Sequence, residues 1–262
     1  MTAVSLQAPW RLDDRNQTVS VDGATWSFVD TRADGPALVL LPGSVGTHEV
    51  FYKQLAALGR THRVVAATYP GLERPQALAD SLAGFLKQLG LRDAVVAGSS
   101  FAAYWVQAFG VRHQDCLRGL VLVNGFSDGR LLRTHPLFSP ALVGRNAAEL
   151  QAAWRDAVAA GPESELKHLQ LDMLGGRQPA DVLKTRLAAV INGAPLELHG
   201  IDKPVIVLDC EDDPIIGGAA RTAFAQAHAQ ADHITLSRGG HYPHIINPDA
   251  YNEVLARSDT WQ

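Results

Sequence analysis

The sequence predicts an α/β fold in which helices flank a mostly parallel central β-sheet. Short runs of β-branched and aliphatic residues alternate along the chain with longer segments whose apolar residues recur three or four positions apart. Runs that are apolar at every position are typical of parallel strands covered on both faces by helices. The chain has 262 residues, of which 47% are hydrophobic and 19% charged, so it can bury one large core.

The predicted strands begin with a hairpin. Residues 18–21 and 25–29 are separated by Asp22-Gly23, a pair that suits a tight turn with positive φ. The later runs are apolar enough to be buried on both faces of the sheet. These core strands are expected at residues 37–41, 63–67, 94–97, 119–123, 204–208 and 233–236.

Helical periodicity fills the intervals between most of these strands. Leu78, Leu82, Phe85 and Leu89, for example, follow the spacing of one apolar helix face. The expected crossover and terminal helices are 48–58, 75–89, 101–111, 219–228 and 249–256.

One long interval interrupts this alternation. Residues 126–202 contain no convincing strand, only helical patterns broken by prolines and paired glycines. Because structureless connections of this length are uncommon, we expect a helical lid inserted between late strands of the sheet. The chain then divides into a core, residues 1–125 and 203–262, and a lid, residues 126–202. Two ordinary crossover helices with long loops are the alternative.

Composition argues against several functional classes. The formal net charge of -4 gives no broad basic surface, so a nucleic-acid partner is not expected. The longest apolar runs are far shorter than the roughly 20 residues of a membrane-spanning helix, and charged residues interrupt the start of the chain where an export signal would be apolar. Cys116 and Cys210 are too few for a disulfide framework. We therefore expect a soluble, cytoplasmic protein.

The sharpest local motif is a cluster of small residues where a predicted strand runs into a helix. Gly98 and Ala102 lie two residues before and two after Ser100, which matches the nucleophile-elbow pattern G-x-S-x-G with alanine in the last position. A serine on such a sharp turn needs small neighbours at these two positions. Ser99 would have the bulky Phe101 there instead, so Ser100 is the candidate nucleophile. A non-catalytic turn is the alternative.

A serine hydroxyl needs a base to remove its proton and an acid to orient that base. In hydrolases with this elbow the chain order is serine, acid, histidine. An acidic loop follows the predicted strand at residues 204–208, and its Asp213 is the candidate acid. Asp209 and Asp212 are rivals that would otherwise cap a helix or remain solvated. Asp128, after the strand at residues 119–123, is a further rival.

The candidate base is His241, in a glycine-flanked loop after the last predicted strand. Such a loop can bring an imidazole over the carboxyl edge of the sheet, where an elbow serine also points. His244 is close in sequence, but we interpret it as a packing or surface residue.

Acyl transfer also requires donors for the developing oxyanion. The backbone N–H of Phe101, directly after the elbow serine, is one candidate. The loop after the first core strand, Pro42-Gly43-Ser44, is small enough to supply a second donor, the backbone N–H of Ser44.

The chain resembles the maspardin-like branch of the α/β-hydrolase superfamily from about Ala37 to Leu255. The likeness rests on the elbow, on the loop Gly239-Gly240-His241-Tyr242-Pro243, and most specifically on Asn124-Gly125-Phe126-Ser127-Asp128. The resemblance implies the α/β-hydrolase fold. It also implies an alternative function, because maspardin resembles a non-catalytic binding protein with asparagine in place of the catalytic histidine. This chain has His241 at that position.

These features predict a serine hydrolase that acts on a small, apolar acyl substrate, such as a carboxylic ester. Thioesters, lactones and activated carbon–carbon bonds remain open, because one triad serves all of them. No metal-ligand spacing, phosphate-binding loop or dinucleotide fingerprint is present, so cofactor-free chemistry is expected. The candidate substrate-binding residues, which could equally form the lid's own core, are Leu131, Leu132, Phe138 and Trp154 in the lid, together with Tyr242.

Overall fold

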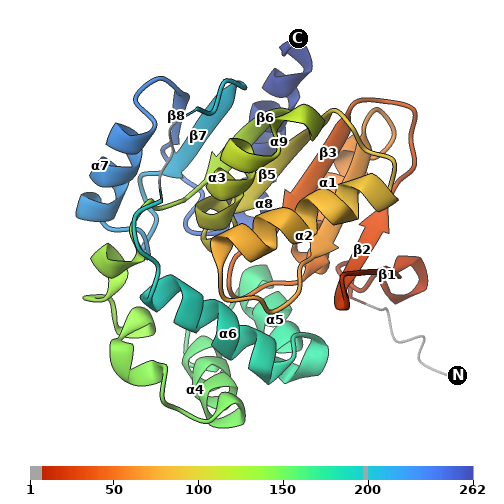
Figure 1. Ribbon diagram of the computed structural model, residues 1–262. Helices are drawn as coiled ribbons and strands as arrows, with labels where there is room; N and C mark the ends of the chain where they lie inside the picture. Colours follow the sequence, from red (N-terminus) through yellow and green to blue (C-terminus); the bar gives the residue numbers. More distant parts are fainter. Residues whose placement is uncertain (1–7, 197–199, 262) are drawn as a thin grey trace, which may run out of the picture.

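The computed structural model describes residues 8–196 and 200–261, and its centre is an eight-stranded sheet. The strands lie in the order β1-β2-β4-β3-β5-β6-β7-β8 (Figure 1). The expectation of an α/β fold with a mostly parallel sheet is confirmed. The strands are β1 (Gln17–Val21), β2 (Ala24–Asp30), β3 (Ala37–Leu41), β4 (Arg63–Thr68), β5 (Ala94–Ser99), β6 (Leu117–Val123), β7 (Val205–Cys210) and β8 (Asp232–Leu236).

The strands β1 and β2 form the expected antiparallel hairpin at one edge. Asp22 and Gly23 at its turn both have positive φ, 49° and 82°. β2 pairs antiparallel with β4, and all later pairings are parallel. The strand order reverses at β3, which lies between β4 and β5, and Leu41 at the end of β3 is paired with Gly98 in β5. The loops that follow β3 and β5 therefore start side by side, at the kind of position where α/β sheets bind ligands.

Helices cover both faces of the sheet, and two separate cores result. Val39 and Leu41 of β3 point to the core beneath α2 and α3, while Leu38 and Leu40 point to the core beneath α1 and α9. This alternation follows from the two-residue period of a strand. The helices outside the long interval are α1 (Tyr52–Leu58), α2 (Pro75–Gln88), α3 (Phe101–Arg112), α7 (Gly218–Ala227), α8 (Pro243–Ile246) and α9 (Pro248–Arg257).

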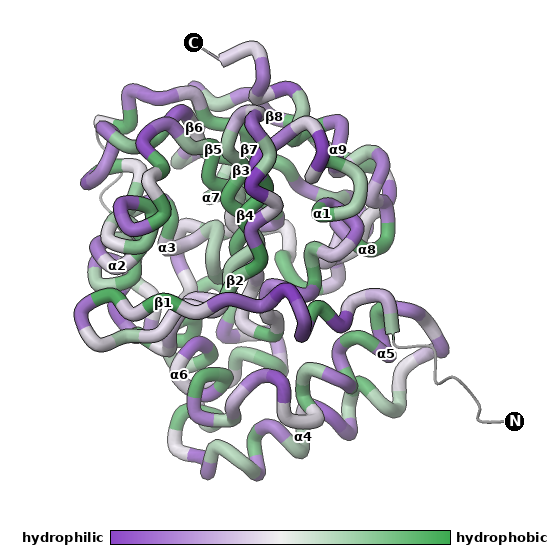
Figure 2. Tube along the Cα trace, turned by 90° about the vertical axis from the view of Figure 1, so that its right-hand side faces the viewer, coloured by the Kyte–Doolittle hydropathy of each residue, from purple (hydrophilic) through white to green (hydrophobic). Residues whose placement is uncertain are grey.

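The long interval between β6 and β7 is helical in its described residues. It begins with short 3₁₀ turns and continues with α4 (Ala147–Ala159), α5 (Glu165–Asp172) and α6 (Ala180–Ile191). We call residues 126–202 the helical insertion. Figure 1 shows its helices grouped below the sheet, and Figure 2 shows the same separation from the side, with the largely hydrophobic central strands above. None of the described helices is long and apolar enough to cross a membrane.

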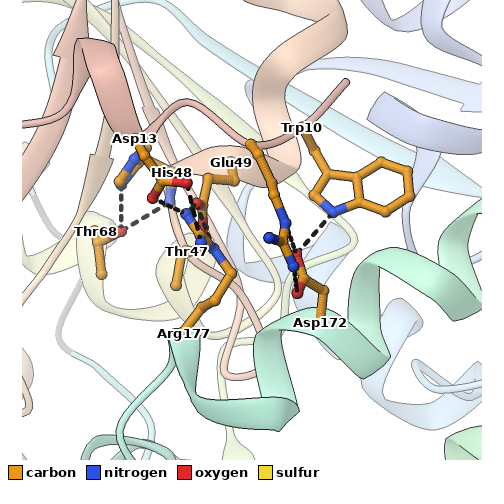
Figure 3. Close-up of polar contacts among 9 residues, drawn as sticks. Trp10, Asp13, Thr47, His48, Glu49, Thr68, Asp172 and Arg177 are labelled. Carbon is orange, nitrogen blue, oxygen red and sulfur yellow. Dashed lines mark hydrogen bonds and ion pairs between the residues drawn. The ribbon is translucent and has the colours of Figure 1, made fainter. Parts of the chain in front are cut away.

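Residues near the start of the described chain join the core to the helical insertion (Figure 3). Arg177 of the insertion forms ion pairs with Asp13, at 2.6 Å, and with the buried Glu49, which follows β3 in the core. Arg11 Nη2 lies 2.8 Å from Asp172 Oδ1, at the end of α5. The segment after α5 is therefore held to the core by charged contacts.

Candidate active site

Ser100 lies on a strained turn between β5 and α3. Its φ and ψ are 54° and −115°, a conformation that residues other than glycine rarely adopt. A Cβ atom at Gly98 would lie 2.8 Å from the carbonyl carbon of Ala102 and 2.9 Å from its oxygen, closer than van der Waals contact allows. The small residue two positions before Ser100 is thus required by close packing of the following helix. Ser100 is 7% exposed.

Asp213 and His241 come together across two loops at the carboxyl edge of the sheet. The imidazole Nδ1 of His241 lies 2.9 Å from Asp213 Oδ2 and 3.1 Å from Oδ1. The carboxylate also accepts backbone N–H groups of Ile215, at 2.7 Å, and Ile216, at 3.3 Å. Because the carboxylate occupies Nδ1, the other ring nitrogen, Nε2, is left for chemistry.

The electrostatics favour an ionised Asp213. Its side chain is fully buried, which by itself raises the pKa of the carboxyl group. The hydrogen bond and charge of His241, with the two backbone N–H donors, outweigh this effect, and the pKa of Asp213 lies below its ordinary value. A carboxylate that stays ionised can fix the orientation of the imidazole and stabilise its protonated form.

Two of the three rival carboxylates, Asp128 and Asp212, have other partners, whereas Oδ1 of Asp209 is buried without a hydrogen-bond partner among the described residues. Asp128 caps a 3₁₀ turn by accepting the N–H of Arg130 at 3.0 Å and pairs with that residue's guanidinium at 2.8 Å. Asp212 accepts the N–H groups of Gly239 at 2.9 Å and Gly240 at 2.7 Å. Asp212 therefore shapes the loop that carries His241, a supporting role that the sequence analysis did not anticipate.

Asn124, directly after β6, is a second supporting residue, and although it belongs to the stretch that carries the family resemblance, the sequence assigned it no role. Its Nδ2 donates to Gly240 O at 2.9 Å, and its Oδ1 accepts the N–H of Cys210 at 3.0 Å. It thus joins the loop of His241 to the end of β7, from which the loop of Asp213 departs. Asn124 itself has a φ of 44°, a value that asparagine tolerates better than most residues.

Ser100 and His241 line the same pocket, which has a volume of about 430 Å³. The hydrogen bonds among the described residues do not include one between their side chains. In unliganded hydrolytic sites this bond is often long and tightens when substrate binds. The arrangement therefore brings Ser100, His241 and Asp213, the candidate nucleophile, base and acid, to one edge of the sheet.

The loop after β3 lies directly against Ser100. A Cβ atom at Gly43 would lie 3.1 Å from Ser100 Cβ and 3.6 Å from Ser100 Oγ. Ser44 follows in the pocket wall. The N–H of Phe101 is the first of α3, and the first N–H groups of a helix have no partner within it. Ser44 and Phe101, the residues that carry the two candidate oxyanion donors, therefore lie in the loop and at the helix start that adjoin Ser100.

The pocket wall opposite the sheet comes from the helical insertion and is mostly apolar. Phe138 and Trp154 lie in this wall, and Tyr242 lines the same pocket from the loop of His241. The expectation for Leu131 and Leu132 is not met: Leu131 is 39% exposed, and Leu132 is buried in the core. The other described insertion residues in the wall are Leu137, Ala157, Val158, Leu166 and one polar residue, Gln170.

His244 is buried at the back of this pocket and packs against aromatic rings. Its ring centroid lies 4.9 Å from that of Phe51, 5.6 Å from Tyr242 and 5.7 Å from Tyr251. Burial lowers the pKa of His244 to about 3, so the imidazole is neutral at physiological pH. The interpretation as a packing residue agrees with this environment.

The buried His244 gives a testable dependence of stability on pH. The unfolded chain binds a proton at this residue near pH 6.5, whereas the folded chain does so only near pH 3, so acid favours unfolding throughout this window. Between pH 7 and pH 5, His244 should lower the free energy of unfolding by about 2 kcal/mol. Urea unfolding of His244→Gln should show a decline smaller by that amount. Equal declines in wild type and His244→Gln would contradict the prediction.

A model described as the Alpha/beta hydrolase family matches residues 38–254. RutD of Pantoea ananatis, whose name describes it as a carbamate hydrolase, is 24% identical over 246 residues. The match covers 86% of this chain and 88% of RutD. Human maspardin is 26% identical over 241 residues, covering 88% of this chain and 78% of maspardin. The enol-lactonase of Burkholderia xenovorans has a similar structure, with a TM-score of 0.77 at 20% identity, covering 92% of this chain and 99% of the lactonase. The chain belongs to the alpha/beta hydrolase family.

Proposed function

We propose that the protein hydrolyses a carboxylic ester or a related acyl compound, with Ser100 as nucleophile, His241 as general base and Asp213 as the acid that orients it. One observation carries the proposal: the buried carboxylate of Asp213 holds Nδ1 of His241 at 2.9 Å, in a pocket that also contains Ser100 on its strained turn. A pocket that only bound a ligand would have no need of this pair beside an elbow serine.

The reaction has two stages. In the first, His241 Nε2 takes the proton of Ser100 Oγ while Oγ bonds to the substrate carbonyl carbon, and the N–H groups of Ser44 and Phe101 stabilise the oxyanion. The imidazolium then gives its proton to the leaving alcohol as the carbon–oxygen bond breaks, which leaves an acyl-enzyme. In the second, His241 takes a proton from water, the resulting hydroxide attacks the acyl carbon, and Ser100 leaves with the proton as the carboxylic acid is released.

The pocket favours a neutral substrate with an apolar acyl or alcohol part. Among the described residues, its wall from the helical insertion is built from Leu137, Phe138, Trp154 and similar residues, with Gln170 as the one polar side chain. Such a wall has little to offer a charged group in exchange for its hydration. We infer that the helical insertion acts as a lid that covers the bound substrate. Esters, thioesters, lactones and carbamates all present a carbonyl to the same groups, so a panel of these bonds is the appropriate substrate screen.

The direct test is reaction with a fluorophosphonate probe, followed by intact-mass and peptide analysis. We expect one covalent adduct per chain, located on Ser100, because the probe reports a serine activated by its base. Heat-denatured protein, which retains the serine but not the site, is the control and should not react. The contrary outcome is that the native chain forms no adduct under conditions that label a known serine hydrolase. That outcome would support the competing function, a non-catalytic binding protein, which the resemblance to maspardin allows.

A further inference from the structure

The loop after β3 is held in place by side chains that lie far away in the sequence. We call residues 43–46 the oxyanion loop. Each of its four carbonyl oxygens accepts a hydrogen bond from a side chain. The donors are Tyr69 Oη to Gly43 at 3.2 Å, Gln178 Nε2 to Ser44 at 2.6 Å, Tyr242 Oη to Val45 at 3.0 Å, and Arg186 Nη1 to Gly46 at 2.8 Å.

Two of these donors, Gln178 and Arg186, belong to the helical insertion and are almost completely buried, with exposures of 1% and 0%. Gln178 makes a second bond to the loop, because its Oε1 accepts the N–H of Gly46 at 3.0 Å. Its side-chain amide therefore both donates a hydrogen bond to the loop backbone and accepts one from it, as the backbone of a neighbouring strand would.

Arg186 is a buried cation whose partners in the described chain are backbone carbonyls and an aromatic ring. Besides its bond to Gly46, Nη1 lies 3.4 Å from Gly43 O, Nη2 donates to Tyr69 O at 2.7 Å, and the guanidinium lies 3.7 Å above the centre of the Tyr69 ring. Burying a cation without a carboxylate is costly, so several oriented acceptors must compensate. Here those acceptors are the carbonyl oxygens of Gly43 and Gly46 in the oxyanion loop, together with the carbonyl oxygen and the ring of Tyr69.

Peptide geometry connects these contacts to the reacting atoms. The peptide unit is planar and trans, so the Gly43 carbonyl and the Ser44 N–H point in opposite directions. Bonds from Tyr69 and Arg186 to Gly43 O therefore determine where the Ser44 N–H points. Glycine at position 43 gives this peptide unusual freedom to rotate, and the bond from Gln178 to Ser44 O restrains the following peptide.

We propose that Tyr69, Gln178 and Arg186 are positioning residues that aim the Ser44 N–H at the substrate oxyanion, so that the helical insertion completes the oxyanion hole. This inference rests on the proposed function. An insertion with this role does more than cover the substrate, because its part around residues 178–186 helps to lower the barrier of the chemical step.

The test uses Tyr69→Phe, which removes one hydroxyl and retains the ring beneath Arg186. The matched control is Tyr104→Phe, since Tyr104 also donates its hydroxyl to a backbone carbonyl, that of Ala194, at 2.7 Å. Loss of a complete oxyanion donor costs about 10²–10³ in kcat. For Tyr69→Phe, where the donor is only misdirected, we expect roughly a 10-fold fall in kcat on an aryl ester with KM changed less than about twofold. Gln178→Met, which removes both of its bonds to the loop, should lower kcat roughly 100-fold.

A second measurement separates positioning from a merely structural role. An aryl boronic acid forms a tetrahedral adduct with the serine, in which one oxygen occupies the oxyanion position. Its inhibition constant should rise in each variant by the same factor as kcat/KM falls, while Tyr104→Phe should match wild type in both. An unchanged kcat in Tyr69→Phe and Gln178→Met, or a fall in kcat with unchanged boronate affinity, would overturn the inference while leaving ester hydrolysis by wild type intact. A wild-type protein that neither hydrolyses esters nor labels at Ser100 would overturn both proposals.

Discussion

Replacing Ser100 with alanine should lower kcat by on the order of 10⁵-fold to 10⁶-fold, since the acyl-enzyme can no longer form. The comparison variant is Ser99→Ala, which removes the neighbouring hydroxyl, a buried group without a hydrogen-bond partner among the described residues. It should retain activity within about tenfold, because Ser99 ends β5 and does not lie on the strained turn. Steady-state kinetics on an aryl ester, with adduct formation as a second readout, decides between the two serines.

The opposite ranking, with Ser99→Ala inactive and Ser100→Ala active, would show that the nucleophile has been misassigned. Similar residual activity in both variants would mean that the observed hydrolysis does not pass through the elbow. Ser100→Ala should also relieve the strain of its unusual backbone only slightly, since alanine has the same difficulty with positive φ. Loss of activity would therefore not be explained by unfolding, which circular dichroism can check.

Asp213→Asn should lower kcat by about 10⁴-fold with little change in KM, because a neutral amide neither fixes the required imidazole tautomer nor stabilises the imidazolium. Asp128→Asn is the matched control: it makes the same chemical change at the rival carboxylate, which is bonded to Arg130 rather than to His241. It should keep nearly full activity. If Asp213→Asn were active and Asp128→Asn were not, the acid of the site would come from the end of β6 instead.

The sequence predicted most of the sheet because the core strands are marked by continuous apolar runs. The expected strand at residues 94–97 is found as Ala94–Ser99, and that at residues 119–123 as Leu117–Val123. The helix expected at residues 48–58 begins instead as a 3₁₀ turn, His48–Phe51, before α1. Strand ends were the least accurate, since pairing with neighbours decides where a strand stops.

The three candidate catalytic residues could be proposed from sequence because each follows a recognisable strand, and parallel strands bring such loops to one edge. Leu131 and Leu132 were wrongly expected in the pocket wall because periodicity does not tell which face of a short 3₁₀ turn meets a cavity. Gln178 and Arg186 were missed for a different reason. Their partners lie more than 100 positions away, so no local pattern indicates that these polar side chains are buried.

The ties between residues 172–186 and the core constrain how a substrate can enter. Arg177 and Asp172 are paired with residues near the start of the chain (Figure 3). Gln178 and Arg186 are bonded to the loop beside Ser100. Displacing this end of the insertion would break those bonds together. Among the described residues, no ion pair or side-chain hydrogen bond joins residues 127–164, which include Phe138 and Trp154, to the core. We therefore expect this part of the insertion to move when substrate enters, while α6 stays in place.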